Sequence, residues 1–145
     1  MASFKQYTAS GGASEAFSIP SFTSDEIKVY VDNVLKTATT HYNITSYTTS
    51  GGTVTWTGGN VPSSGTVRIV RDTGVTTARA TYAAGTSVKA GDLNDNQTQV
   101  LRSLEEQDDQ LIQTYNIENS AITTAKIKAD NITSALIADD QINSE

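Results

Sequence analysis

The chain has 145 residues, a net charge of −6, a pI of about 4.6 and no cysteine. This length suits one domain with an appendage, and the missing cysteines exclude disulfides, thiolate zinc sites and a cysteine nucleophile. The single histidine, His41, excludes a histidine-built metal site, and the acidic balance argues against nucleic-acid binding. Apolar runs are only a few residues long, so we expect neither membrane insertion nor a secretory signal.

The first ninety residues read as short strands separated by glycine turns. Residues 26–31 alternate polar and apolar side chains, with Ile27, Val29 and Val31 on one face, which is typical of a strand. Asp32 and Asn33 then predict a tight turn into residues 34–36, and therefore a hairpin. Further strands are expected at residues 4–8, 16–19, 41–47, 54–56 and 67–70. Several short strands of this kind predict a small antiparallel β-sandwich, with a small barrel as the alternative, and Trp56 in its core.

A helix is expected over residues 91–113, with Asp92 as its N-cap. Leucine, valine and glutamine follow one another at heptad spacing along it, at Leu93, Gln97, Val100, Leu104, Gln107 and Leu111. Leu101 and Ile112 widen this stripe. Two interpretations stay open: a short coiled coil with two glutamines in its seam, or an amphipathic helix that lies on the sheet.

The tail, residues 114–145, carries isoleucine at every fifth position. The series begins just before the tail, at Ile112, and continues through Ile117, Ile122, Ile127, Ile132, Ile137 and Ile142. A period of five fits neither a helix nor a flat strand, so we expect turn-and-strand units that bury one isoleucine each by stacking. A single chain coiled on itself is one solution, and three parallel chains around one axis is the other. Seven units barely complete two turns of a single-chain coil, which favours the trimeric shaft.

No constellation of residues in the sequence assembles an active site, so we expect no enzyme, no metal and no cofactor. Residues 92–96 imitate the start of a calcium loop, but Gln97 and Ser103 stand where glycine and glutamate are needed. Arg68, Arg71 and Arg79 form a modest basic cluster in an acidic chain. They predict either surface charge that aids solubility or a docking contact with an acidic partner.

Residues 4–110 resemble the N-terminal anchoring domain of tail fibres in T-seven-type podophages, the autographiviruses. The family pattern is an arginine-bearing strand, a turn of small residues, and a Ser-x-Leu-x-Ala-x-Asp-Leu-Asn run that opens a glutamine-rich helix. Here Val88 stands where that leucine would be. The matching residues lie at 67–73, 76–82 and 85–94, with further likeness at 7–8, 17–20, 29–31 and 42–44.

This resemblance implies a virion structural protein located in the tail fibre. Such fibres are homotrimers that attach to the tail through its adaptor and nozzle proteins, while their distal part meets the host surface. Since family members are long, either this chain is a truncated or short fibre or a separate distal fibre protein continues the shaft. Two other classes are weighed against it: a carbohydrate-binding module, suggested by Trp56 and the tyrosines, and a depolymerase, which lacks well-placed paired carboxylates.

A threefold shaft on a tail without a threefold axis needs a joint. Two stretches could supply it: residues 82–91, which contain small residues and Gly85, and residues 114–120, where the heptad gives way to the period of five. The glycine-containing stretch is the predicted joint, because small residues accept backbone rotation at low cost.

Overall fold

The computed structural model describes residues 3–109 together with Ile122 and Ile127. The chain divides into two compact units, Met1–Gln110 and Leu111–Glu145. The first unit contains all the strands and the helix of the described residues, so the helix belongs with the β strands. The second unit carries the isoleucine repeat, of which only Ile122 and Ile127 are described, and both are exposed.

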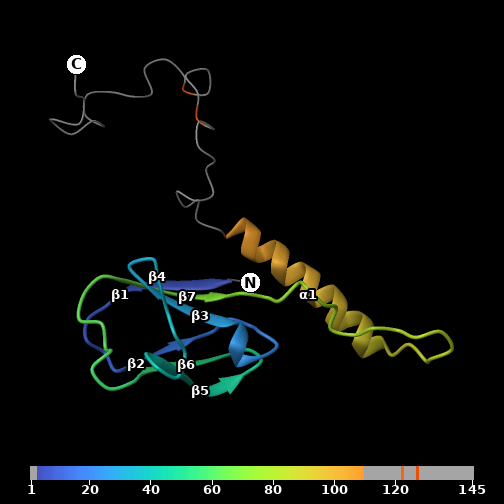
Figure 1. The fold of residues 1–145 in the computed structure, drawn as a ribbon, viewed down its shortest axis with the longest axis horizontal. Coiled ribbons are helices and arrows are strands. Elements are labelled where there is room, and N and C mark those ends of the chain that lie inside the picture. The colour runs from blue at the N-terminus through green and yellow to red at the C-terminus, as the bar shows by residue number, and fades with distance from the viewer. Residues whose placement is uncertain (1–2, 110–121, 123–126, 128–145) are drawn as a thin grey trace. The chain divides into compact units, whose positions relative to one another are not determined.

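The strands form two antiparallel sheets followed by one helix (Figure 1). The larger sheet has the order β1-β7-β3-β4, with bounds Phe4–Thr8, Thr66–Arg71, Ile27–Val31 and Val34–Lys36. The smaller sheet has the order β2-β6-β5, with bounds Ser14–Phe17, Gly51–Trp56 and Tyr42–Thr48. A short 3-10 helix, Ser24–Glu26, precedes β3. The prediction of short antiparallel strands is confirmed.

The predicted hairpin is present as β3 and β4. Val31 pairs with Val34, and the two residues between them, Asp32 and Asn33, have φ angles of 49° and 64°. Positive φ at both central positions is the signature of a type I′ turn, which matches the twist of the flanking strands. The Asp32 carboxylate also accepts a 2.8 Å hydrogen bond from the backbone N–H of Thr66, which ties the turn to the start of β7.

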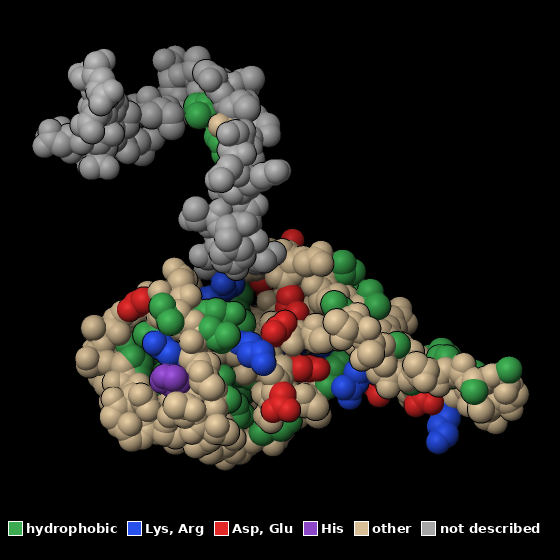
Figure 2. Space-filling view, in the orientation of Figure 1, with side chains coloured by type: hydrophobic (Ala, Val, Ile, Leu, Met, Phe, Trp, Pro, Cys, Tyr) green, Lys and Arg blue, Asp and Glu red, His purple; other side chains and the backbone are tan. Residues whose placement is uncertain are grey.

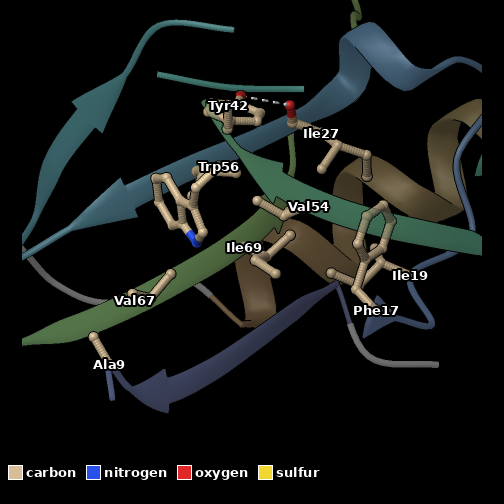
Figure 3. Close-up of a cluster of buried hydrophobic side chains, with 10 residues drawn as sticks. Ala9, Phe17, Ile19, Ile27, Tyr42, Val54, Trp56, Val67 and Ile69 are labelled. Carbon is tan, nitrogen blue, oxygen red and sulfur yellow. Dashed lines mark hydrogen bonds between the residues drawn. The ribbon is translucent and has the colours of Figure 1, made fainter. Parts of the chain in front are cut away.

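The core lies between the two sheets and draws side chains from both (Figure 3). Val29, Val67 and Ile69 of the larger sheet and Val54 of the smaller one are fully buried. The Tyr42 hydroxyl donates to the carbonyl of Ile27 across the two sheets, and Tyr42 meets Trp56 edge-on with ring centroids 6.2 Å apart. The inward faces predicted from period-two alternation are therefore confirmed. Val31 is half-buried and packs against the edge of this core.

Gly51, the first residue of β6, lies close to the backbone at the end of the neighbouring strand β2. A Cβ atom at Gly51 would lie 2.2 Å from the carbonyl oxygen of Phe17, and the residue has a φ of +155°. Gly51→Ala is expected to destabilise the fold by about 1–3 kcal/mol, the usual cost of overpacking. Gly58→Ala is the matched control, because its Cβ would meet no atom within 4 Å. Urea unfolding of both variants measures the difference; equal midpoints would contradict this account of Gly51.

Helix α1 spans Ala90–Asp108, and its N-cap differs from the predicted one, Asp92. Lys89 is the N-cap, because its carbonyl already accepts the 3.3 Å hydrogen bond from the N–H of Leu93. Asp92 lies inside the first turn, where the helix dipole favours an acid whether or not it caps. At the other end Asp109 is the C-cap, and residues 110–113 lie outside the described residues. Within the described residues, no helix is long and apolar enough to cross a membrane.

Candidate functional site

Helix α1 has two opposite faces, and the apolar one points away from its own domain. Leu93, Val100 and Leu104 are 52%, 57% and 53% exposed, whereas the helix's buried residue is Gln99. Charged side chains gather where the helix meets the strands, and hydrophobic side chains lie on its outward side (Figure 2). The interpretation of an amphipathic helix with its apolar stripe on the sheet is therefore wrong. The polar face does the packing, and the apolar stripe stays open in the single chain.

Arg71 of strand β7 makes the strongest link between the sheet and helix α1. Its side chain is completely buried, with Nε 2.6 Å from a carboxylate oxygen of Glu106 and Nη2 2.8 Å from one of Glu105. Nη1 donates to the carbonyl of Pro20 at 2.8 Å, and Nη2 also donates to that of Arg102 at 3.0 Å. Every nitrogen of the guanidinium group is thus engaged inside the molecule.

Thr73, the second residue after β7, adds two hydrogen bonds to this arrangement. Its N–H donates to Glu106 at 2.9 Å and its hydroxyl donates to the same carboxylate at 2.5 Å. We call Arg71, Thr73, Glu105 and Glu106 the Arg71 cluster. Buried charges are tolerated where they are paired and fully hydrogen-bonded, and Arg71 meets both conditions. Arg71 presents no charged surface to a docking partner, although the sequence made it a docking candidate.

The other two candidate arginines lie against aromatic rings. The guanidinium carbon of Arg79 lies 4.3 Å from the centroid of the Phe22 ring, and that of Arg102 lies 4.2 Å from the same ring. Arg68 stacks on Phe4 at 4.6 Å. Cation–π contacts of this kind contribute about 0.5–1 kcal/mol at exposed sites. Burial, reinforced by the charge of Arg71, lowers the pKa of Arg102.

The C-terminal end of helix α1 is fixed to the N-terminal strand. The N–H and the hydroxyl of Ser3 donate to one Asp109 carboxylate oxygen at 3.0 and 2.6 Å, and Arg68 donates to the Asp109 carbonyl at 3.1 Å. The hydrogen bond from the Ser3 hydroxyl, followed by that from its N–H, lowers the pKa of Asp109 below 3.8.

This pKa shift predicts a pH-dependent contribution to stability. A carboxyl group whose pKa is lower in the folded state stabilises the fold above its unfolded pKa, and this contribution disappears as the pH falls through the folded pKa. We therefore expect Asp109→Asn to lower the free energy of unfolding at neutral pH. Below pH 3.8 the difference in free energy of unfolding between this variant and the unmodified protein should become smaller. Urea unfolding at the two pH values measures both gaps. A gap of the same size at acid and neutral pH would show that the Asp109 charge is irrelevant.

Residues 74–89, which we call the arm, run back along helix α1 and are held there by two side-chain amides. The Gln99 amide donates to the carbonyls of Gly74 and Thr77, the latter at 2.8 Å, and accepts from the N–H of Arg79 at 3.2 Å. Asn96 exchanges two hydrogen bonds with the backbone of Ala80, at 2.8 and 2.9 Å. The amides replace the strand partner that this backbone lacks.

These anchors bear on the predicted joint at residues 82–91. A bend there would swing the helix relative to the strands, and such a swing must break the Arg71 cluster and the contacts of Asp109. The described structure therefore opposes a joint at this place. The alternative joint, residues 114–120, lies outside the described residues.

The residues predicted to form a trimer interface fall into two groups. Leu93, Val100, Leu104, Ile122 and Ile127 are described, and each is at least 41% exposed in the single chain. The remaining candidates lie outside the described residues: Leu111, Ile117, Ile132, Ile137 and Ile142.

A small cavity lies beside Trp56 and Tyr7, with Glu15 and Pro62 also in its wall. Its volume of about 40 Å³ holds a water molecule but no sugar ring. Trp56 itself is only 6% exposed, so the expectation of a core tryptophan is confirmed. Across residues 3–109, 122 and 127, no group of three or more histidine, aspartate or glutamate side chains could hold a metal ion.

No protein-family model matches the chain, and no curated protein matches it. The resemblance to podophage tail fibres therefore rests on the sequence motifs of residues 4–110 alone.

Proposed function

We propose that this chain is the base of a bacteriophage tail fibre, a structural protein of the virion that assembles as a homotrimer. One observation carries the proposal: helix α1 packs its polar face against its own domain and leaves a heptad-spaced apolar stripe exposed to solvent. Exposed apolar stripes of this kind indicate a partner. The motifs of residues 4–110 support the choice of a tail fibre among trimeric proteins.

Other copies of the same helix are the partner that this stripe fits. Leu93, Val100 and Leu104 recur at spacings of seven and four, which is the repeat that a parallel helix with the same sequence complements. Gln97 lies within the seam, where a polar residue fixes register and the number of chains at a cost in stability. The isoleucines that recur at every fifth position of residues 114–145 also favour assembly, since each repeat unit needs copies beside it to bury its isoleucine.

The β domain is then the part of the chain that attaches to the phage tail, through the adaptor and nozzle proteins of that tail. The Arg71 cluster supports this role because it fixes helix α1 to the β domain. A force on the fibre is then transmitted through the helix to the domain that attaches to the phage tail. Arg79, which is exposed, and Arg68, which is half-buried, remain candidate docking residues. The contact with the host surface is then made either by residues 114–145 of this chain or by a separate distal fibre protein.

Labelling of virus particles tests the proposal. Antibodies against the β domain should mark the tails of purified particles from the phage that encodes this chain, and excess purified chain should abolish the label. A chain that is made during infection yet absent from purified particles would contradict the proposal. A carbohydrate-binding module, the alternative, would instead bind a glycan array as a monomer, although the burial of Trp56 removes its best stacking platform.

A further inference from the structure

We propose that the arm of one copy packs against helix α1 of the adjacent copy, with Val75 of the arm on Leu101 of the neighbour. This inference rests on the proposed trimer and adds to it a second interaction surface outside the helical seam. The arm would act as a clasp that links each chain to the next around the axis.

The first observation is that the arm leaves its apolar side chains in water. Asn96 and Gln99 bind its backbone between Gly74 and Ala80, and Val75, within this bound part, is 65% exposed. Tyr82 and Val88, further along the arm, are 40% and 54% exposed. A segment that is fixed in place by its backbone, with apolar side chains directed outward, is organised to meet another surface. Its fixed backbone also lowers the entropy that binding would cost.

The second observation is an exposed leucine that the seam does not need. Leu101 is 55% exposed and lies next to the seam residue Val100. In the heptad that places Leu104 at an a position and Val100 at a d position, Leu101 occupies an e position. Positions e and g flank the seam and normally carry charges that pair between chains. A leucine there indicates an apolar neighbour.

The third observation is the side of the helix on which the arm lies. Asn96, which holds the arm, occupies a g position in the same heptad, and Gln99 occupies a c position beyond it. In a parallel bundle the g side of one helix faces the e side of the next. Leu101 is two residues beyond Gln99 and therefore about 200° around the helix, out of reach of its own arm. The neighbour's Leu101, by contrast, lies on the side that the arm faces.

The axial positions also agree. Gly74 is level with Gln99, whose amide binds its carbonyl, and Val75 is the next residue. Leu101 lies two residues further along the helix, a rise of about 3 Å. In an in-register parallel bundle the neighbour's Leu101 has the same height as the chain's own. Val75 and the neighbour's Leu101 are therefore level within one side-chain length.

Cysteine cross-linking tests this contact, because the natural chain contains no cysteine. We would make the full chain with Val75→Cys and Leu101→Cys together, oxidise it, and examine it by non-reducing gel electrophoresis, with its solution mass measured by light scattering. Each copy should join the next at both ends, so a closed covalent trimer is expected. Leu35→Cys with Leu101→Cys is the control, since Leu35 is 53% exposed but lies on strand β4, away from the arm. A short bis-maleimide provides a second reading that does not need disulfide geometry.

The outcomes separate the clasp from the trimer itself. Covalent trimers in the arm pair, and not in the control pair, would support the clasp. A trimer by light scattering that gives no inter-chain link with either reagent would overturn the clasp and leave the proposed function standing. A monomer by light scattering would overturn the trimer, and the clasp with it. Equal cross-linking of both pairs would show that exposure alone explains the link, and would also overturn the clasp.

Discussion

Arg71→Met is expected to lower the free energy of unfolding by about 3 kcal/mol, the lower end of the range for breaking a buried ion pair. Methionine keeps much of the side-chain volume but removes four hydrogen bonds, two of them to carboxylates and two to backbone carbonyls. The carbonyls of Pro20 and Arg102 are left without this donor. Glu105 and Glu106 retain part of their contact with water, which limits the loss.

Arg79→Met is the matched control for this experiment. It removes the same charge from the same acidic protein, but Arg79 is exposed and its cation–π contact with Phe22 contributes only about 0.5–1 kcal/mol. Chemical unfolding of the two variants, followed by tryptophan fluorescence from Trp56, gives the comparison directly. If both variants unfold at the same denaturant concentration, Arg71 does not hold helix α1 on the sheet.

The fate of Arg71 shows what the sequence could and could not predict. Alternation along β7 places Val67, Ile69 and Arg71 on one face, and this face is the buried one. That parity was a readable signal that Arg71 needs internal partners. Glu105 and Glu106 follow Arg71 by more than thirty residues. Their pairing depends on where helix α1 lies, which no local pattern encodes.

The same division holds for the other elements. The β3–β4 hairpin could be predicted because Asp32 and Asn33 tolerate positive φ, and the core faces could be predicted because their alternation is local. The arm could not, because the Gln99 and Asn96 amides that hold it act on backbone far away in the sequence. Hydrophobic spacing found the stripe on helix α1 but could not say whether the sheet or other copies cover it.

Leu104→Asp is expected to dissociate the proposed trimer. The substitution would place three carboxylates at one level of the shared seam, and it would also remove three buried leucine side chains. Each leucine is worth about 1.5–3 kcal/mol of burial, so assembly should weaken by about 4.5–9 kcal/mol, at least a thousandfold. Sedimentation velocity should then show single chains at concentrations where the unmodified protein is trimeric.

Leu35→Asp provides a close control for Leu104→Asp. Leu35 and Leu104 are both 53% exposed in the single chain, so the two substitutions change the same residue type at the same accessibility. Leu35 lies on strand β4 and has no place in the heptad. The Leu35 variant should keep the mass of the unmodified protein. Loss of the trimer in both variants, or in neither, would show that the apolar stripe on helix α1 does not drive assembly.

The mass of the unmodified chain in solution is the most direct test of the central claim that the open face of helix α1 is covered by copies of itself. Size-exclusion chromatography with multi-angle light scattering should give three times the 15.4 kDa of one chain, and the value should hold on dilution. A mass of one or two chains across the concentration range would contradict the account.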